Sequence, residues 1–366
     1  GRTLHQFSEP WTAPDTVAAA SSVPSSPFRI YPRREQSEPK REYVTKNLST
    51  AGLDIVAGDF TGSGGLEIMI SDGSGLTLYQ WDQGGLIWTW ESEDSPGWRT
   101  LHIDAADFEG DGRSELLVVK VRRGDLLSEA FAWDSGEWHS LGRITGVYLR
   151  ALEGGTGGSV LLGQRAGVNT VFSGPVRQYV HEGDSFRPAD GMKLPAGIGI
   201  FGTALADVDG DGEGEILTLS DTGRLRVFTP GGDILFESRN RYNGYPARIE
   251  PTELFGARLV DGGVREGFFT DAYPDDTTGK DPIADIFSAF QGRILTAREA
   301  DGTLVVTLPR NGSGPGKLLP NLRSFDKGDV VLLRWEDGRF EEFRQSKRQD
   351  GVVSDIAWAD TDGDGV

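Results

Sequence analysis

The strongest chemical signal in the sequence is an acidic motif that recurs in a fixed pattern, D-x-D-G-D-G-x-x-E. Its clearest copy contains Asp207, Asp209, Asp211 and Glu215, with Glu213 at position 7. The glycines let the backbone curl, so that the acids at positions 1, 3 and 5 converge, position 7 offers its carbonyl and position 9 closes the shell. Ca²⁺ takes about six to eight hard oxygen ligands and tolerates a flexible cage, whereas Mg²⁺ demands tighter octahedral geometry. The motif therefore predicts a calcium site.

Three further copies retain part of the motif. Residues 107–115 keep it with one longer acid, residues 360–366 contain positions 1 to 7, and residues 59–67 keep only two carboxylates. We expect the copy at 59–67 to bind weakly or to stay empty, and degenerate copies near 152, 259 and 309 lack the ligands. The predicted ligands are Asp107, Glu109, Asp111, Arg113 at position 7 and Glu115; Asp360, Asp362 and Asp364; and Asp59, Thr61, Ser63 and Glu67.

Two other interpretations of the acidic motif are less suitable. Asp-Gly clusters also occur in plain turns, but neighbouring acids repel by roughly 4 kcal/mol per close pair at an effective dielectric constant near 20, and a plain turn has no reason to accept that cost. An EF-hand loop has about twelve residues and leads into a helix. Here the segments that follow, ELLVV (115–119) and EILTL (215–219), have the composition of strands.

Alternating segments around glycine-containing turns also recur along the chain, and they predict β-hairpins. Their ranges are 76–90, 129–141, 176–186, 224–236, 285–295 and 330–343. The copies of the acidic motif interleave with these hairpins and begin near 59, 107, 152, 207, 259, 309 and 360. Each unit then supplies one strand before the loop, one after it and a hairpin. The sequence predicts an all-β fold, a seven-bladed β-propeller of four-stranded antiparallel blades.

The two ends of the chain are out of phase with this repeat. Residues 351–366 hold only an inner strand and an acidic loop, while 27–33 and 41–48 have the pattern of strands with no inner strand before them. We therefore expect residues 27–366 to form one propeller domain, closed by N- and C-terminal strands, with blade 7 shared between 27–48 and 351–366. Residues 1–26, rich in Ser, Pro and Ala, are expected to be a linker or extended segment.

Composition limits the classes of function. The 366 residues carry a net charge of −19 without basic stripes, which argues against binding to a nucleic-acid backbone. No run approaches the roughly 18 apolar residues of a membrane span. The absence of Cys removes disulfides, thiolate catalysis and Cys-based metal sites, and is compatible with an oxidising compartment. The four histidines form no HExxH motif, and we expect His102, His139 and His181, on predicted strands, to be structural.

The segments DFEGDGRSELLVV (107–119) and DVDGDGEGEILTL (207–219) resemble the FG-GAP/VCBS repeats of bacterial surface proteins and of the integrin α-subunit propeller. The resemblance covers residues from about 50 to 366. It implies a seven-bladed propeller whose calcium loops join the first and second strands of a blade, on the face opposite the usual ligand face. Glu at position 9, and the lack of the Phe-Gly/Gly-Ala-Pro sequence in most copies, make the bacterial VCBS type more similar. Integrin-like adhesion is not implied.

On the expected ligand face, two segments combine aromatic, amide and cationic side chains, namely 238–246 and 268–282. The candidate ligand-binding residues are Arg239, Arg241, Tyr242, Asn243, Tyr245 and Tyr273. Such loops suit recognition of glycans or peptides. An ordinary exposed loop, whose tyrosines cover apolar neighbours, fits the same residues equally well.

Three classes of function stay open, because a fold does not fix a function. We favour a non-catalytic calcium-binding module or scaffold for a protein or glycan ligand, located extracellularly, in the periplasm or at the outer-membrane surface of a bacterium, with further domains in a longer chain as an option. A propeller lectin would carry one sugar site per blade, but the aromatic residues at equivalent loop positions do not repeat. A polysaccharide-active hydrolase or lyase would need a His, Tyr or carboxylate cluster at the axis, and the sequence shows no such convergence.

Overall fold

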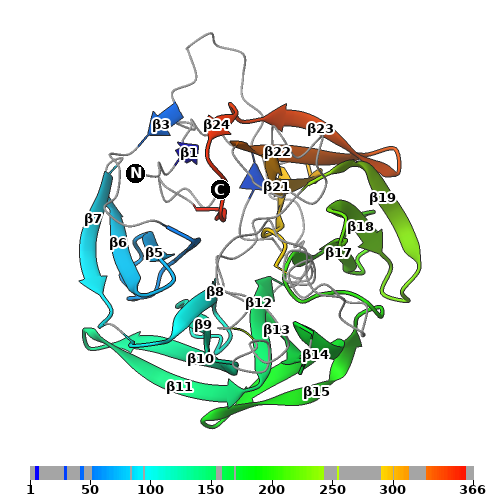
Figure 1. Cartoon of the computed structure of the whole chain (residues 1–366). Helices are drawn as coiled ribbons and strands as arrows, with labels where there is room; N and C mark the ends of the chain where they lie inside the picture. The colour runs from blue at the N-terminus through cyan, green and yellow to red at the C-terminus, as the bar shows by residue number, and fades with distance from the viewer. Residues whose placement is uncertain are drawn as a thin grey trace, which may run out of the picture.

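The chain is arranged as a β-propeller. The computed structural model describes residues 5–7, 29–30, 42–44, 52–82, 85–93, 95–153, 159–168, 170–242, 254, 290–299, 301–312 and 327–359. Within these residues, five sheets are arranged as blades around a common centre (Figure 1). Four of them are four-stranded and antiparallel, and the fifth is a six-stranded sheet built on four antiparallel strands. This all-β architecture of radially arranged antiparallel blades confirms the predicted fold class.

In every blade the strands follow one another in chain order, with the first strand nearest the centre (Figure 1). Blade 1 consists of β4 (Asp54–Gly58), β5 (Glu67–Ser71), β6 (Leu76–Asp82) and β7 (Gly85–Glu91), and blade 2 of β8 (Arg99–Ala106), β9 (Glu115–Arg122), β10 (Asp125–Asp134) and β11 (Glu137–Thr145). Blade 3 consists of β12 (Val147–Glu153), β13 (Ser159–Ala166), β14 (Phe172–Glu182) and β15 (Ser185–Lys193). Blade 4 consists of β16 (Thr203–Ala206), β17 (Glu215–Leu219), β18 (Arg224–Phe228) and β19 (Ile234–Arg241), and blade 5 of β20 (Leu295–Glu299), β21 (Leu304–Gly312), β22 (Lys327–Glu336) and β23 (Arg339–Gln345).

The hydrophobic core lies between neighbouring blades. Second strands are covered on both faces, so β5 and β17 are buried at every position and contain nearly continuous apolar runs. One buried cluster combines Met69 of blade 1 with Leu116 of blade 2, and another combines Leu225 of blade 4 with Val306 of blade 5. Packing between blades therefore provides the hydrophobic stabilisation that a single sheet could not supply.

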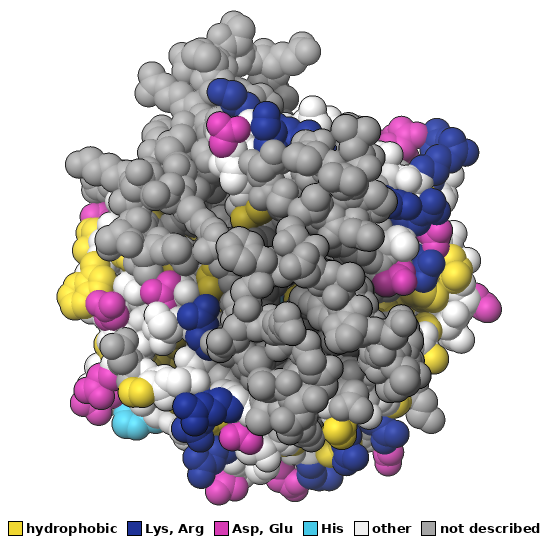
Figure 2. Space-filling view, viewed as in Figure 1, with side chains coloured by type: hydrophobic (Ala, Val, Ile, Leu, Met, Phe, Trp, Pro, Cys, Tyr) yellow, Lys and Arg dark blue, Asp and Glu magenta, His cyan; other side chains and the backbone are white. Residues whose placement is uncertain are grey.

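The outermost strands are largely exposed, as expected for sheet edges that face solvent. On β7, Ile87 and Trp88 have exposed fractions of 49% and 58%. Figure 2 shows hydrophobic side chains gathered at that edge of the molecule, while acidic and basic side chains are interspersed around the rim. Among the described residues on this face, the positive charges do not form a stripe.

Five of the six predicted hairpins are confirmed. They are the strand pairs β6–β7, β10–β11, β14–β15, β18–β19 and β22–β23. The tightest turns are Ser135-Gly136 and Asp337-Gly338, where both residues have positive φ. That geometry is a type I′ turn, whose twist matches the flanking strands and which favours glycine at the second position. The glycine positions therefore allowed these turns to be located from the sequence.

The prediction of seven blades is wrong, because the described residues form five. Residues 290–294, expected in a sixth hairpin, lie outside strands and lead into β20, the first strand of blade 5. The glycine-rich copy near 309 is not a loop between first and second strands. Its start lies within β21, where a buried apolar run pairs with β22 as far as Gly312. The copies near 259 and 360, which the prediction counted as two further units, lie outside the described residues.

The strands near the N-terminus pair differently from the prediction. Residues 27–33 and 41–48 were expected to form one hairpin. Instead, β2 (Arg29–Ile30) pairs in parallel with β20, and β3 (Glu42–Val44) pairs with β1 (His5–Phe7). The short strands therefore add to blade 5 and to a separate two-stranded sheet. The domain boundaries 1–26 and 27–366 stay predictions.

The segment 351–359 spans the joint between blade 5 and blade 1. It contains no strand, although β24 (Gln349–Asp350) just before it pairs with β22. The Asn311 side chain on β21 exchanges two hydrogen bonds with the Val353 backbone, at 2.8 and 3.0 Å. The Ser354 hydroxyl donates to the carbonyl of Gly52, at 3.1 Å. The segment thus joins the two blades where the ring closes, but through side chains rather than a strand ladder.

Tyr242, one of the predicted ligand-binding residues, is part of the core. Its exposed fraction is 3%, and it belongs to the buried cluster shared by blades 4 and 5. Its hydroxyl donates to Glu342 on β23, at 3.0 Å. By contrast, Arg239 and Arg241 are exposed on β19. For Tyr242 the structure favours the alternative in which the side chain covers apolar neighbours.

We therefore predict that Tyr242→Ala destabilises the propeller by about 3–5 kcal/mol, the usual cost of deleting a buried aromatic ring. Urea denaturation followed by circular dichroism would measure the loss. Arg239→Ala, at an exposed position three residues earlier in the chain, is the matched control and should shift stability by less than about 0.5 kcal/mol. Equal stability of both variants would contradict the assignment of Tyr242 to the core.

Candidate functional sites: the acidic loops and the axial cluster

Three acidic loops connect the first and second strands of blades 1, 2 and 4, at residues 59–66, 107–114 and 207–214. Their backbones curl in the same way, because each has two glycines with positive φ at positions 4 and 6 of the motif. These glycines are Gly62 and Gly64, Gly110 and Gly112, and Gly210 and Gly212. A side chain is strained in that region, so the motif requires glycine there. The predicted position of these loops between first and second strands is confirmed.

In the blade 2 loop, Asp107, Asp111 and Glu115 each bring a carboxylate oxygen within 4.8 Å of the others. Asp107 accepts hydrogen bonds from the backbone N–H groups of Gly110 and Gly112, at 2.6 and 2.9 Å. Glu115 accepts one from Phe108, at 2.8 Å. The loop amides therefore hold the first and last acids of the motif in place, facing one another.

The blade 4 loop has the same construction. Asp207, Asp209 and Glu215 bring oxygens within 4.8 Å of one another. Asp207 accepts from the N–H of Gly210 at 2.8 Å, and Glu215 accepts from that of Val208 at 2.6 Å. These all-oxygen donor sets are the kind that hard divalent cations prefer. Within the described chain, the loops of blades 2 and 4 are acidic clusters that could hold an ion.

The glutamates that close these loops are buried, with exposed fractions of 3% for Glu115 and 2% for Glu215. Burial raises the pKa of Glu115 to about 7, and the nearby Asp107 and Glu109 carboxylates add to this effect. Burial also raises the pKa of Glu215, with a further contribution from the aspartates of its loop. A cation between these oxygens would offset both causes, because opposite charge favours the ionised form.

The blade 1 loop fills the same place with hydroxyl groups. Thr61 donates from its hydroxyl and its backbone N–H to Glu67, and Ser63 donates to the same carboxylate at 3.4 Å. Asp59 accepts from the N–H of Gly64 at 2.9 Å, while its other oxygen is buried without a hydrogen-bond partner. Two hydroxyls thus take the place of two acids. Weak or absent ion binding at this loop stays a prediction.

Several predicted ligands are exposed or have other partners. Asp111 is paired with Arg113, whose guanidinium donates to it at 2.7 and 3.0 Å. Glu109 is exposed, and Asp211 accepts from the N–H of Glu213 at 2.8 Å. The sequence interpretation used only the carbonyl of Arg113 and missed that its side chain covers a ligand. Asp360, Asp362 and Asp364 lie outside the described residues.

Each acidic loop also touches the blade that follows it. The Asp59 carbonyl accepts from the N–H of Ser114 at 2.9 Å, and Glu109 lies 3.4 Å from Nδ1 of His181. In blade 4, Asp207 forms an ion pair of 3.1 Å with Arg298 on β20. The loops are therefore joints between blades as well as candidate ion sites.

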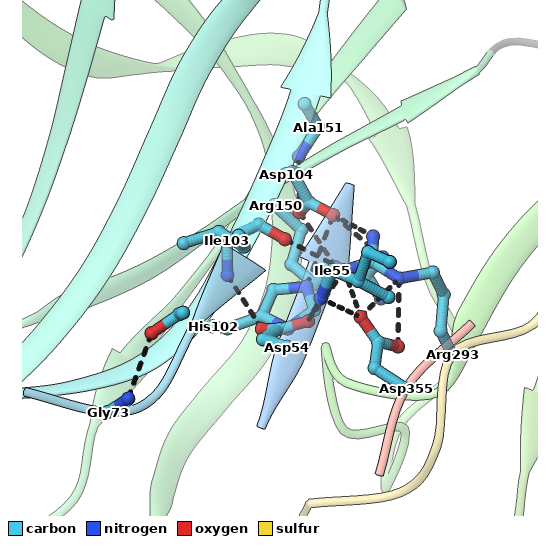
Figure 3. A network of polar contacts seen from close by, with 11 residues as sticks. Asp54, Ile55, Gly73, His102, Ile103, Asp104, Arg150, Ala151, Arg293 and Asp355 are labelled. Atoms are coloured by element: carbon cyan, nitrogen blue, oxygen red, sulfur yellow. Dashed lines mark hydrogen bonds and ion pairs between the residues drawn. The ribbon is translucent and has the colours of Figure 1, made fainter. Parts of the chain in front are cut away.

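A second polar site lies where the inner strands converge, and the sequence analysis missed it. It contains three acids and three bases, each at most 12% exposed (Figure 3). Its members are Asp54 on β4, His102 and Asp104 on β8, Arg150 on β12, Arg293 just before β20, and Asp355 in the segment 351–359. We call these six residues the axial cluster. The expectation that no such groups converge at the axis is wrong.

His102 lies at the centre of the axial cluster, between two carboxylates. Its Nδ1 is 2.9 Å from Asp54 and its Nε2 is 3.1 Å from Asp104. Only an imidazolium can donate from both nitrogens. Burial opposes the charged ring, but the two carboxylates outweigh it and raise the pKa of His102. The expectation of a structural histidine agrees with this arrangement.

The two arginines connect the remaining parts. Arg293 donates to Asp355 at 3.0 to 3.2 Å, to Asp54 at 3.1 Å and also to Asp104. Arg150 donates to Asp104 at 3.0 Å. The cluster thus brings three basic side chains together with three acidic ones. Despite its burial, Asp104 has a pKa held well below the usual range by Arg150 and its other cationic neighbours.

The positions of three axial residues relative to the acidic motif could have indicated this site. Asp54, His102 and Asp355 each stand five residues before the first acid of a motif copy, at 59, 107 and 360. Equivalent positions on successive inner strands lie at the same height along the axis, so three charged residues in this phase could have predicted convergence. Arg150 and Arg293 show no comparable signal.

Comparison with known proteins supports the repeat assignment. Residues 46–118, which contain blade 1 and the first half of blade 2, match the family model described as FG-GAP-like repeat. The matched segment includes the acidic loops of blades 1 and 2. No curated protein matched the chain.

Solved structures similar to this chain have low sequence identity. The biofilm matrix protein Bap1 of Vibrio cholerae is 17% identical, with a TM-score of 0.30, over 51% of this chain and 28% of that one. A functionally unknown protein from Desulfotomaculum acetoxidans is 11% identical, with a TM-score of 0.38, over 82% and 71%. A putative 6-phosphogluconolactonase from Bacteroides uniformis is 9% identical, with a TM-score of 0.39, over 84% and 75%. This chain thus spans less than a third of the length of Bap1.

We predict that Glu115→Gln stabilises the metal-free protein more at pH 8 than at pH 5. The pKa of about 7 exceeds the ordinary 4.5, so between these values the folded state holds a proton that the unfolded state has lost. The contribution of Glu115 therefore falls as pH rises through this window, and a neutral glutamine avoids the loss. Urea midpoints in chelator at both pH values would measure it, with Glu137→Gln on exposed β11 as control. A variant effect independent of pH would contradict this account.

Proposed function

We propose that this chain is a non-catalytic, calcium-binding β-propeller that acts as a binding or scaffold module. Its ligand is a protein or a glycan, and it works outside the cell, in the periplasm or at the outer-membrane surface of a bacterium. The observation that carries the proposal is the convergence of Asp107, Asp111 and Glu115, and of Asp207, Asp209 and Glu215, in loops of one shape.

Calcium fits these loops better than other cations. The donors are carboxylates, with the carbonyls at Arg113 and Glu213 available as further oxygens, and no nitrogen or sulfur ligand takes part in either described cluster. The loops are exposed and glycine-rich, which suits the flexible shell of calcium more than the compact shell of magnesium. Bound Ca²⁺ would neutralise the buried glutamate and its aspartates at once. Among the three described acidic loops, only that of blade 1 has hydroxyl groups, those of Thr61 and Ser63, that donate hydrogen bonds to its buried glutamate.

The location follows from expected affinity and composition. Arg113 forms an ion pair with Asp111, and Arg298 forms one with Asp207. A cation must therefore compete with an internal positive charge in both loops. Such sites suit the high calcium levels outside the cell, where modules bind with dissociation constants of about 10⁻⁴–10⁻³ M. A chain without Cys also has no thiol that an oxidising environment could convert to a disulfide. No helix among the described residues has the length and apolar character needed to cross a membrane.

The proposed ligand face is opposite the acidic loops. Arg241, the last residue of β19, pairs with Arg224 at the start of β18, and the next N–H donates to the carbonyl of Gly223. This end of blade 4 is remote from the loop 207–214, at the other end of β17. Arg239 and Arg241 are exposed there and remain candidates for ligand contact. Asn243, Tyr245 and Tyr273 lie outside the described residues and complete the proposed set.

A polysaccharide-active enzyme is the second candidate, because the axial cluster places a histidine and carboxylates beside a cavity. That cavity has a volume of about 50 Å³, much smaller than the roughly 300–1,000 Å³ of typical ligand pockets. The imidazole nitrogens of His102 are both engaged with carboxylates, and Asp355 is engaged with Arg293. General acid–base catalysis needs a group that can exchange a proton with substrate. Charge pairing therefore favours a structural role.

Calcium should raise the melting temperature, and a chelator should lower it. At a hundredfold excess over its dissociation constant, one site adds about 2.7 kcal/mol to the free energy of unfolding. Asp209→Ala should remove much of the response, because it deletes a donor of the blade 4 loop. Asp59→Ala, at the hydroxyl-filled loop, is the matched control and should leave the response intact. Melting curves identical in calcium and in chelator would refute calcium binding.

A glycan and protein array probed with the calcium-loaded chain would test the binding role. We expect a specific ligand whose affinity falls about tenfold or more in Arg241→Ala, with an unchanged melting temperature because this side chain is exposed. Arg187→Ala, exposed on β15, controls for general loss of positive charge. Cleavage of an arrayed polysaccharide would instead support the function as an enzyme. Binding that is unaffected by Arg241→Ala would show that the ligand does not bind at this end of blade 4.

A further inference from the structure

The joint between blades 5 and 1 is crossed by the segment 351–359. This segment forms no strand there, so no backbone ladder holds it in place. One of its anchors is Asp355, which accepts hydrogen bonds from Arg293 and from the N–H of Ile55 on β4, at 3.1 Å. Closure of the ring thus depends on a carboxylate that belongs to the axial cluster (Figure 3).

We propose that this joint is a pH-sensitive latch, held tightly while the axial cluster keeps its protons and loosened in alkaline solution, when His102 and the Asp54–Asp355 pair lose them. The inference does not depend on calcium or on a ligand.

The first step of the argument concerns charge. When His102 is neutral it has one N–H, so it can donate to Asp54 or to Asp104 but not to both. Once the Asp54–Asp355 pair has also lost its shared proton, the cluster holds three carboxylates and two guanidinium groups in a buried place. An unbalanced buried charge is costly, and the structure must release a group or take up a proton.

The second step concerns Asp54 and Asp355, whose carboxylates share donors. The N–H of Ile55 lies 3.2 Å from Asp54 Oδ1 and 3.1 Å from Asp355 Oδ2, and Nη2 of Arg293 lies 3.1 and 3.0 Å from the same two oxygens. Carboxylates held this close cannot both ionise without repulsion, so the pair favours one shared proton. Burial and the Asp54 charge raise the pKa of Asp355 to about 7, against the attraction of Arg293.

The third step identifies the group that gives way. Asp54 and Asp104 lie within β4 and β8, which are held by strand ladders on β5 and β9. Asp355 lies in the segment without a strand. Release of Asp355 therefore costs least, and it detaches the segment from Ile55 and Arg293 together.

The other groups around His102 do not titrate near neutral pH. Arg150 and Arg293 stay protonated, the pKa of Asp104 lies well below its usual range, and the ring of Phe201 packs edge-on at 5.2 Å. The cavity of about 50 Å³ is lined by Asp54, His102 and Asp355, and it is large enough for water to carry protons to them. The change in charge is thus confined to the latch.

The direction of the effect follows from linkage. His102 and Asp355 both bind a proton more tightly in the folded state, since the pKa of each is raised. Their stabilisation is complete below the unfolded values, about 6.5 for His and 3.9 for Asp, and is lost as pH rises through the folded values. Both contributions therefore weaken the joint above neutral pH.

Hydrogen exchange of residues 351–359, corrected for intrinsic rates, tests the latch in the full chain at about pH 6 and about pH 8.5. We expect protection to be about tenfold lower at the higher pH, equivalent to a single pKa unit of linkage. A peptide from β11 in the same samples serves as internal reference. Equal protection of 351–359 at both pH values, or an equal loss in β11, would overturn the proposal.

Two variants test whether the named groups cause the difference. Asp355→Asn imitates the protonated acid and should remove most of the pH dependence, and His102→Gln should do the same by removing the titrating ring. His139→Gln on exposed β11 is the matched control and should keep the full difference. If Asp355→Asn fails to fold, His102→Gln carries the test. A pH difference that persists unchanged in the folded variants would refute the latch.

Discussion

The balance of buried charge at the axis is the constraint on which the arrangement of blades depends. Charged side chains are removed from water at a cost of several kcal/mol each, and only complete pairing offsets it. Here the partners come from blades 1, 2 and 3, from the start of blade 5 and from the segment 351–359. None of these four blades can shift without leaving a charge unpaired, at a cost of about 3–5 kcal/mol. Apolar packing between blades supplies stability, and the axial cluster fixes their relative positions.

The acidic loops also contain buried charged groups that need partners. In each, a buried glutamate accepts backbone N–H groups from the start of its loop, so the loop is shaped around a carboxylate. In blade 1 the hydroxyls of Thr61 and Ser63 complete this arrangement without a cation. In blades 2 and 4, acids stand at those positions, and the glutamate retains a raised pKa. Small changes at positions 3 and 5 therefore separate a loop completed by hydroxyl groups from an acidic cluster that could hold an ion.

Local features were predictable from the sequence, and features that depend on repeat phase were not. Turn glycines located five hairpins, because positive φ restricts the residue at these turns. The prediction of seven blades included units near 259 and 360, and both positions lie outside the described residues. The glycine-rich segment near 309 begins within β21, and only the pairing of β21 with β22 identifies it as a strand.

Long-range contacts account for the features of the sites that the sequence missed. Arg293 lies 189 residues from Asp104 in sequence, and nothing in its surroundings indicates that they meet. The burial of Tyr242 likewise depends on Glu342, from another blade. By contrast, the acids of each loop lie within nine residues, so their convergence could be predicted.

The contacts between each acidic loop and the following blade have a consequence for how this architecture can change. Gly58 lies so close to Ser114 that a Cβ atom there would stand 2.5 Å from its hydroxyl oxygen, and Asp207 is matched to Arg298. Blades 1, 2 and 4 thus each carry a feature specific to the blade that follows. The blades share one strand arrangement, but they cannot replace one another. Duplication, deletion or exchange of such a blade would place its acidic loop beside a blade that lacks the matching residues. Propellers of this kind can gain or lose blades only when both sides of a joint change together.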